Sequence, residues 1–259
     1  MNELKALIFD VDGTLADTER DGHRVAFNLA FAEAGLDWQW SVALYGQLLA
    51  VTGGKERIRY YLDEFNSDYE LPGGGPEELT RYIARLHQAK TRHYTRMLAD
   101  GAIPMRPGVK RLLQEARDSG LRLAIATTTT LANVTALLQH SLAADAASWF
   151  DVIAAGDMVK AKKPAPDVFM LALQKLGLTP RQCLAFEDSH NGIKSAMGAD
   201  LCTVVTINAY TEGHDFSGAA LVLDHYGEPD QPFTVLQGDA MGARFVNVDQ
   251  LRQIHRSCY

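Results

Sequence analysis

Five short apolar runs, spaced along the chain, constrain its fold more than any other feature. Each run is partly β-branched and ends in polar or small residues, and amphipathic stretches with helical spacing lie between most of them. Apolar strands that alternate with helices predict an α/β architecture, with a parallel sheet covered on both faces. The runs are 4–9, 121–127, 150–156, 182–188 and 201–207, and the helical stretches are 108–119, 131–141, 166–176 and 190–198.

The segment 17–100 has a different pattern. It is helical almost throughout, contains no apolar strand run, and is interrupted by two glycine-rich joints, 52–54 and 72–75. We therefore predict a core domain formed by 1–16 and 101–259, and a helical cap domain, 17–100, inserted just after the first strand. The tail beyond about residue 224 has mixed character and carries no motif that points to a function. A short edge strand and a final helix are expected there.

Composition excludes several classes of function. The net charge of -7 and the pI of about 5.6 do not suit non-specific nucleic-acid binding, although a local basic cluster can still hold a small anion. No stretch approaches the apolar length of a membrane span, and the N-terminal segment lacks the features of a signal peptide. We expect a cytoplasmic protein with neither a nucleic-acid nor a membrane partner. The three cysteines lack zinc-type spacing and are expected to be two buried thiols and one tail thiol, with no disulfide framework.

The first candidate for chemistry is the pair Asp10 and Asp12, at the end of the first apolar run. Both carboxylates reach one site if the chain turns at Gly13, whose conformational freedom allows that turn. With a divalent cation to offset charge repulsion, Asp10 can attack a phosphorus atom, and Asp12 can protonate the leaving oxygen and later activate water. Ordinary Asp-Gly turn chemistry explains the same residues about equally well when they are taken alone.

Hydroxyl and lysine side chains follow two later runs. Thr127, Thr128 and Thr129 come directly after a strand, where hydroxyls and backbone amides form an anion site, although a threonine helix cap is the simpler alternative. Lys163 precedes a proline, which favours an extended backbone that directs the charge to one place. Two adjacent lysines, Lys162 and Lys163, are also typical of a solvated surface pair.

Glu187 and Asp188 end the fourth apolar run. Paired acids at a strand end are costly without positive charge nearby, and Mg²⁺ is a hard cation that prefers such oxygen ligands. A helix N-terminus that favours acids is the alternative. Each motif is modest alone. Their order along the chain, nucleophile, hydroxyl, lysine and acid, favours a single catalytic site at the strand ends.

These four motifs resemble those of the haloacid dehalogenase superfamily of phosphotransferases, whose core is a Rossmann-like parallel sheet. The resemblance implies that Asp10 is the nucleophile and Asp12 the general acid and base. It also implies that Thr127 and Lys163, with Thr128 and Thr129 beside them, bind the transferred phosphate. The implied Mg²⁺ ligands are Asp10, the Asp12 carbonyl and Asp188, with Glu187 as a further candidate.

The cap segment contains two basic groups of residues. Gly53 and Gly54 expose backbone amides, and Lys55 and Arg57 follow on the first helical turn, which predicts a cradle for a second phosphate. A flexible joint is the alternative for the glycines. His87 and Lys90, three residues apart, share a helix face, with Arg92 close by. From spacing alone, a solvated basic face is the simpler explanation of that second group.

Taken with the motifs of the core, these cap segments are similar to those of the CbbY-type phosphatases within the β-phosphoglucomutase and phosphoglycolate phosphatase branch. The resemblance implies a phosphorylated sugar as substrate, namely xylulose-1,5-bisphosphate, a misfire product that inhibits Rubisco. A mutase or a phosphoglycolate-type phosphatase stays open, whereas the intact core motifs argue against a non-catalytic sensor. Many capped relatives are monomers, and a monomer is expected here. The resemblance leaves the place of His23 open and implies these cap positions for substrate binding: Glu19, Tyr45, Gly53, Gly54, Lys55, Arg57, His87 and Lys90.

Overall fold

The computed structural model describes residues 3–51, 53–70, 74–156 and 158–259. Thr52 and the Pro72-Gly73 half of the second predicted joint lie outside the described residues. The chain forms two compact units, which we describe separately. The larger unit contains Met1–Asp17 and Ile103–Tyr259, and the smaller unit contains Thr18–Ala102.

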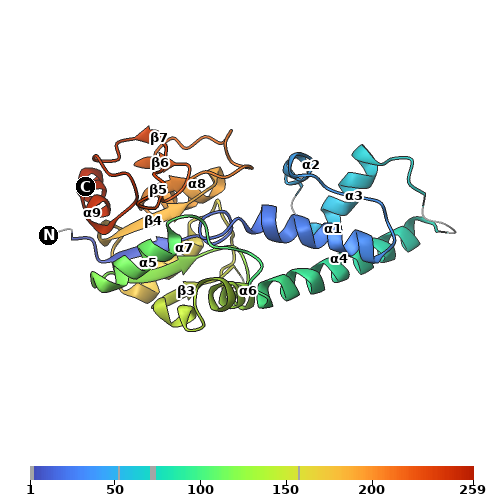
Figure 1. Ribbon diagram of the computed structural model, residues 1–259, viewed down its shortest axis with the longest axis horizontal. Coiled ribbons are helices and arrows are strands. Elements are labelled where there is room, and N and C mark those ends of the chain that lie inside the picture. Colours follow the sequence, from blue (N-terminus) through green and yellow to red (C-terminus); the bar gives the residue numbers. More distant parts are fainter. Residues whose placement is uncertain (1–2, 52, 71–73, 157) are drawn as a thin grey trace. The chain divides into compact units, whose positions relative to one another are not determined.

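The larger unit is built on a seven-stranded sheet in the order β3-β2-β1-β4-β5-β6-β7 (Figure 1). All neighbouring pairs are parallel except β6 and β7, which are antiparallel. This arrangement confirms the predicted α/β fold with a parallel sheet. The strands are β1 (Ala6–Phe9), β2 (Arg122–Ala126), β3 (Val152–Ala154), β4 (Cys183–Glu187), β5 (Cys202–Thr206), β6 (Leu221–Leu223) and β7 (Val235–Gly238).

Helices bury both faces of the central strands. Ala6 and Ile8 of β1 belong to an apolar cluster that includes side chains of α7 and α8. Leu7 and Phe9 point to the opposite face and are also buried, as successive side chains of a strand alternate. α5 contacts β2, and α9 contacts both β4 and α5. The helices of this unit are α5 (Val109–Asp118), α6 (Leu131–Leu137), α7 (Asp167–Leu176), α8 (His190–Gly198) and α9 (Val248–Cys258).

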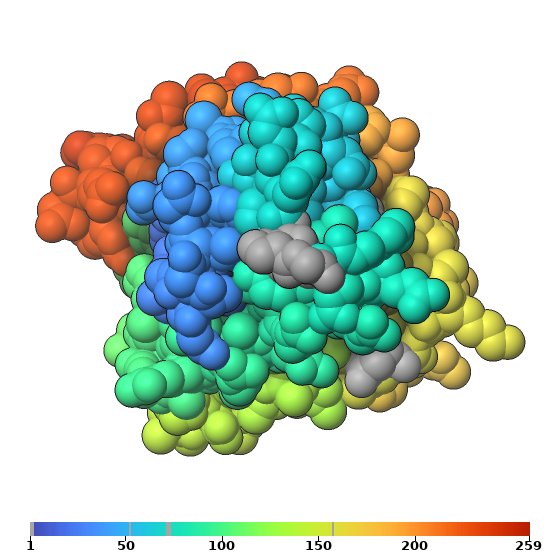
Figure 2. Space-filling view, turned by 90° about the vertical axis from the view of Figure 1, so that its right-hand side faces the viewer, coloured from blue at the N-terminus to red at the C-terminus, as the bar shows by residue number. Residues whose placement is uncertain are grey.

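The smaller unit is helical in the residues that the structure describes. A π-helical segment (Thr18–His23) leads into α1, which packs along the long helix α4. Its interior is rich in aromatic side chains, among them Phe27 and Trp40, whose ring centroids lie 4.7 Å apart. Figure 2 shows the surface of this unit in blue to teal. Its helices are α1 (Arg24–Glu33), α2 (Val42–Leu48), α3 (Gly54–Phe65) and α4 (Pro76–Ala99).

The tail and the cysteines both add to the sequence analysis. The expected edge strand and final helix correspond to β7 and α9. The sequence does not predict β6, because three apolar residues among small and polar ones give too short a pattern to recognise. The prediction of three free thiols is wrong for two of them. Cys202 and Cys258 form a disulfide between the start of β5 and the end of α9, whereas Cys183 is free and buried. The two partners are 56 residues apart, so only the packing of the tail brings them together.

Candidate active site

The sheet order brings the predicted motifs to one edge. β1 lies between β2 and β4, with Phe9 in register with Ile125 on one side and Phe186 on the other. The residues that follow these strands, Asp10, Thr127 and Asp188, therefore emerge at the same carboxyl edge. Asp10 is fixed further by its backbone N–H, which donates to the Phe186 carbonyl at 2.9 Å. Ligands of open parallel sheets bind at this edge.

Lys163 lies between two carboxylates. Its ammonium Nζ donates to Asp10 Oδ1 at 2.6 Å and to Glu187 Oε1 at 2.5 Å. The Lys163 side chain is only 7% exposed, whereas Lys162 is exposed. The two adjacent lysines therefore differ. Lys162 matches the solvated alternative considered for the pair, and Lys163 places its charge among the strand-end acids.

Asp10, Glu187 and Asp188 form a buried acidic cluster. Each offers one carboxylate oxygen, and these three atoms lie within 4.8 Å of one another. Two glycines make room for the cluster. A Cβ atom on Gly13, whose φ is +85°, would lie 2.2 Å from Asp188 Oδ2, and one on Gly192 would lie 1.8 Å from Glu187 Oε2. No side chain fits at either position without displacing a carboxylate.

Burial and like charge dominate the electrostatics of the cluster. Burial raises the pKa of Glu187 to about 7; Asp10 adds to the rise and Lys163 opposes it. Burial, together with Glu187 and Asp10, holds the pKa of Asp188 well above its usual range. Burial alone would lower the pKa of Lys163, but Asp10 and Glu187 outweigh that effect and raise it. One ammonium is thus too little positive charge for three ionised carboxylates.

The donor set fits a hard divalent cation. Buried carboxylates within a few ångströms of one another are the ligands that Mg²⁺ prefers, and a cation among them would favour their ionised forms. Asp188 Oδ2 also accepts a hydrogen bond from Asn208 Nδ2 at 2.7 Å, which orients that carboxylate. Ligand carboxylates are commonly held by such outer hydrogen bonds.

The other core candidates lie in the turns beside this cluster. Asp12 is half-buried in a turn closed by the Gly13 N–H, which donates to the Ala16 carbonyl at 2.8 Å. Thr127 is fully buried, and its Oγ1 accepts from the Thr129 N–H at 3.3 Å. The helix cap considered as the alternative falls on Thr130, whose Oγ1 accepts from the Asn133 N–H.

In the smaller unit, Tyr45 joins two of the predicted cap positions. The Tyr45 hydroxyl donates to Glu19 Oε2 at 2.6 Å and accepts from Arg57 Nη1 at 2.7 Å. Burial raises the pKa of the Glu19 carboxyl. His23, Arg57 and the Tyr45 hydroxyl together lower that pKa by more than burial raises it, so the net shift is downward. A charged carboxylate and guanidinium are therefore held together through one phenol.

Lys90 and its neighbours form the second part of this group. Lys90 Nζ lies 2.8 Å from His23 Nδ1. It also lies 5.1 Å from the ring centroid of Phe27 and 5.0 Å from that of Tyr94. Burial lowers the pKa of His23 to about 4; Lys90 lowers it further and Glu19 opposes the shift. Burial, with Lys90 and Lys55, also lowers the pKa of His87. Both imidazoles are neutral at pH 7.

The remaining cap candidates have diverse surroundings. A Cβ on Gly54 would lie 2.5 Å from the His87 ring, so glycine is required for that approach. Gly53 has a φ of +98°, and Lys55 is exposed. Arg92 binds the Glu33 carboxylate at 2.6 Å on the surface, which matches the solvated-face alternative for that residue only. His23, left open by the sequence, joins the group, which we call the cap cluster: Glu19, His23, Tyr45, Arg57, His87 and Lys90.

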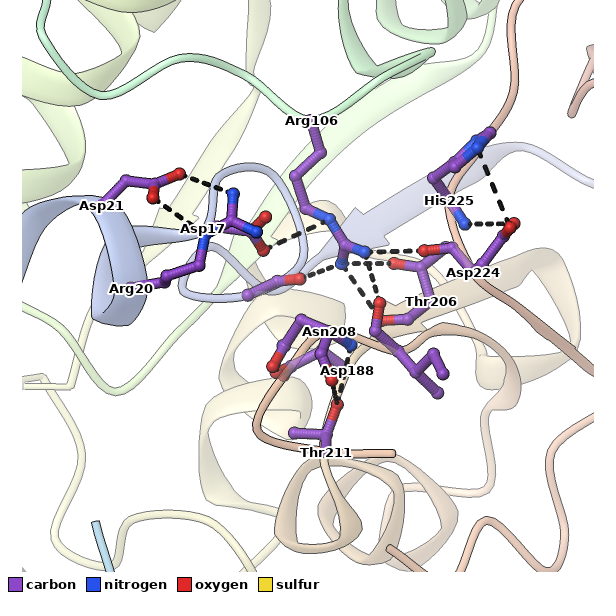
Figure 3. Close-up of polar contacts among 12 residues, drawn as sticks. Asp17, Arg20, Asp21, Arg106, Asp188, Thr206, Asn208, Thr211, Asp224 and His225 are labelled. Atoms are coloured by element: carbon purple, nitrogen blue, oxygen red, sulfur yellow. Dashed lines mark hydrogen bonds and ion pairs between the residues drawn. The ribbon is translucent and has the colours of Figure 1, made fainter. Parts of the chain in front are cut away.

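Sequence reasoning missed Asn208, which donates to Asp188 of the acidic cluster, and Arg106, which donates to the Gly13 carbonyl. Figure 3 shows the Arg106 guanidinium among backbone carbonyls that come from separate segments of the larger unit. Neither residue belongs to a recognisable pattern, because their partners are set by tertiary packing. A charged residue in the turn before Pro107 was the one available signal for Arg106.

Comparison with known proteins agrees with this geometry. The haloacid dehalogenase-like hydrolase profile matches residues 4–200, and the chain belongs to that family. The family and the CbbY relatives described below show that it is a phosphatase. The chain is 54% identical to protein CbbY of Rhodobacter capsulatus, over 84% of this chain and 91% of that one. It is 49% identical to the plasmid-encoded CbbY of Cupriavidus necator, over 88% of each.

A solved structure extends the likeness to ligand binding by a relative. CbbY from Rhodobacter sphaeroides, crystallised as a mutant in complex with xylulose-1,5-bisphosphate, superposes with a TM-score of 0.69. It is 46% identical, over 86% of this chain and 94% of that chain. In the described part of this chain, no helix is both long and apolar enough to cross a membrane.

Proposed function

We propose that this protein is a Mg²⁺-dependent phosphatase that removes phosphate from a sugar bisphosphate, xylulose-1,5-bisphosphate, through an aspartyl-phosphate on Asp10. The observation that carries the proposal is the buried contact of Lys163 with Asp10, beside two further carboxylates at the carboxyl edge of the sheet. Such a constellation suits transfer of an anionic group better than it suits a structural role, because three buried acids around one ammonium destabilise the fold.

Each core residue has a distinct part in this chemistry. A carboxylate oxygen of Asp10 bonds to phosphorus while the bond to the sugar oxygen breaks, and Asp12 gives that oxygen a proton. Asp12 then takes a proton from water, which attacks the phosphorus atom and frees Asp10 and inorganic phosphate. Lys163 and Thr127 hold the phosphoryl oxygens.

Mg²⁺ would be held by Asp10, the Asp12 carbonyl and Asp188, with Glu187 as a further candidate. When bound, it offsets the repulsion between carboxylate and phosphate and stabilises the charge that develops during transfer. The carboxylate of Asp188 is oriented for this role by Asn208.

The smaller unit is proposed to act as the cap that recognises the rest of the substrate. Its cap cluster combines the guanidinium of Arg57 and the ammonium of Lys90 with neutral imidazoles, a set that suits a sugar bearing a second phosphate. The related CbbY crystallised with xylulose-1,5-bisphosphate supports this substrate class. In a cell that fixes carbon dioxide with Rubisco, the reaction would remove an inhibitory misfire product.

A substrate panel tests the proposal. Phosphate release from xylulose-1,5-bisphosphate is measured beside ribulose-1,5-bisphosphate, which differs only in one hydroxyl configuration, with Asp10→Asn as the inactive control. We expect a clear preference for the xylulose compound in the presence of Mg²⁺ and loss of release in EDTA. Conversion of glucose 1-phosphate to glucose 6-phosphate would favour the mutase alternative, and equal rates on both pentulose bisphosphates would remove the proposed specificity.

A further inference from the structure

Arg106 is a buried arginine that the phosphatase chemistry does not use. Its side chain is 6% exposed, and it lies just after the point where the chain returns to the larger unit. Figure 3 shows its guanidinium at the meeting point of several segments. Its partners are the carbonyls of Gly13, Thr206, Ile207 and Asp224, the Thr206 hydroxyl, and the Asp17 carboxylate.

Two of these carbonyls belong to the two segments that lie against Asp188 Oδ2. Nη1 donates to the Gly13 carbonyl and Nη2 to the Ile207 carbonyl. Gly13 approaches Asp188 so closely that a Cβ there would lie 2.2 Å from its Oδ2. Asn208, the residue after Ile207, donates to the same Oδ2 at 2.7 Å. One guanidinium therefore ties together the two backbone segments that contact the Asp188 carboxylate.

The same side chain also connects the ends of strands to the first motif. The Thr206 carbonyl accepts from Nη1 at 3.1 Å at the end of β5, and the Asp224 carbonyl accepts from Nη2 at 2.8 Å just beyond β6. Asp17 Oδ1, 3.4 Å from Nε, belongs to the segment that leaves the larger unit. Arg106 thus connects the turn that carries Asp12 to the ends of two strands through hydrogen bonds. Such a planar fork of donors suits several fixed carbonyls at once.

Arg111 provides a comparison with Arg106 within the same unit. Its guanidinium also donates to several backbone carbonyls and a carboxylate, but at a different place in the fold. It donates to the Gly227 carbonyl at 2.9 Å, the Val246 carbonyl at 2.8 Å and Glu228 Oε2 at 3.0 Å. These three partners belong to the tail, and Arg111 Nη1 also donates to Glu115 Oε2 of its own helix at 3.3 Å. Arg111 therefore joins tail segments to α5, whereas the partners of Arg106 include the two segments that contact Asp188.

We propose that Arg106 is a positioning residue for the reaction: it sets the turn of Asp12 and Gly13 against the Ile207-Asn208 segment, and so fixes the Asp188 carboxylate relative to Asp10 and Asp12. The inference rests on the proposed function for its catalytic consequence. Its structural core, that one side chain orders both segments, is independent of the substrate. Reacting groups must be held within a fraction of an ångström, and a misplacement of about 1 Å costs about 100-fold in rate.

Hydrogen–deuterium exchange tests the ordering directly, without turnover. Arg106→Met removes the fork while keeping an unbranched side chain, and Arg111→Met is the matched control. We expect faster exchange of the amides of 12–17 and 207–211 in Arg106→Met, with the central strands unchanged. In Arg111→Met those two segments should exchange as in the wild type. The proposal is overturned if exchange in Arg106→Met is uniformly faster throughout the larger unit. It is also overturned if exchange at the two segments is no faster than in the wild type.

Kinetics of p-nitrophenyl phosphate hydrolysis test the catalytic consequence. This generic monoester separates the inference from the sugar assignment: a wild type that hydrolyses it but not xylulose-1,5-bisphosphate would sink the proposed substrate alone. We expect kcat to fall about 100-fold in Arg106→Met while KM changes less than about threefold, and Arg111→Met to keep a wild-type kcat. Similar losses of kcat in both variants, in step with their thermal stability, indicate a merely structural role and overturn the proposal.

Arg106→Lys completes the experiment and replaces the Met variant if the latter does not fold. Lysine keeps the charge and loses the planar fork, so a loss of about tenfold in kcat is expected, with local exchange between that of the wild type and the Met variant. A Lys variant with wild-type kcat and exchange overturns the need for the fork. If neither variant folds while Arg111→Met does, Arg106 is a folding residue and the proposal fails.

Discussion

The acidic cluster of the larger unit and the cap cluster of the smaller unit have opposite charge balances. In the first, the ammonium of Lys163 pairs with two of the three buried carboxylates, those of Asp10 and Glu187. In the second, the carboxylate of Glu19 accompanies Arg57 and Lys90, and both imidazoles are neutral. The acidic cluster therefore has more carboxylates than cations, and the cap cluster has more cations than carboxylates. A divalent cation suits the former, and an anionic substrate group suits the latter.

The two groups are also built differently. The acidic cluster stands on strand ends, where sheet register fixes neighbouring residues within the hydrogen-bond ladder. The cap cluster stands on helix faces and a π-helical segment, and side-chain contacts such as Tyr45 to Glu19 and Arg57 hold it together. A substitution in the first should therefore affect chemistry with little change in recognition. A substitution in the second should affect which substrate is chosen.

Asp10→Asn is the sharpest test of that division and has the largest expected effect. The amide cannot act as the nucleophile, so phosphate release should fall by at least about 10⁴-fold, as for removal of nucleophiles elsewhere. Binding of the bisphosphate should persist, because the cap cluster is untouched. Phosphate release and calorimetric binding are the measurements. Activity near that of the wild type would eliminate the aspartyl-phosphate.

Arg57→Ala tests the recognition half of the comparison. If its guanidinium serves a second phosphate, kcat/KM should fall about 30- to 150-fold for xylulose-1,5-bisphosphate, since a charge-assisted bidentate contact is worth about 2–3 kcal/mol. The fall for p-nitrophenyl phosphate should be slight. Arg92→Ala, an exposed arginine of the same unit paired with Glu33, is the control and should change neither. Equal losses on both substrates would refute the role in binding the second phosphate.

Addition of Mg²⁺ probes the charge deficit of the acidic cluster without turnover. A ligand at about 100 times its dissociation constant stabilises the folded state by about 2.7 kcal/mol, which urea unfolding measures. The gain should be larger at pH 8 than at pH 6, because burial raises the pKa of Glu187 to about 7 and the carboxylates must ionise to bind. Asp188→Asn should lose most of the gain. Asp151→Asn, an exposed carboxylate of the same unit, should keep it, and equal gains in both variants would place the cation elsewhere.

Much of the fold and the outline of the core site were predictable from the sequence, for one physical reason. Parallel strands bury continuous apolar runs, so their carboxyl ends are visible as the first polar residues, and these meet at one edge. The sequence predicts Asp10, Thr127 and Asp188 at this edge in this way, and the structure brings Asp10 and Asp188 into one cluster. Arg106, Asn208 and the Cys202–Cys258 disulfide were not predicted, because each depends on contacts between distant segments. The divergence of Lys162 and Lys163 likewise appears only once the loop is folded.

His23 is the cap position that the sequence left open, and its pH dependence gives the smallest predicted effect. Burial lowers its pKa to about 4 in the folded protein, against about 6.5 when unfolded, so the unfolded state binds the proton more tightly. The stabilisation by neutral His23 is complete above pH 6.5 and is lost as the pH falls toward 4. Between pH 7 and 5.5 this amounts to about 1 kcal/mol.

His23→Gln isolates that contribution, because glutamine does not titrate and its side-chain oxygen can still accept a hydrogen bond from Lys90. Urea unfolding of both proteins at the two pH values gives the difference, in which the titrations of Glu187 and Asp188 cancel. The wild type should lose about 1 kcal/mol more than the variant on acidification. An identical loss in both proteins would mean that His23 is protonated as readily in the folded state as in the unfolded chain. The cap cluster would then carry one more positive charge below pH 6.5, and the statement that both of its imidazoles are neutral would hold only above that pH.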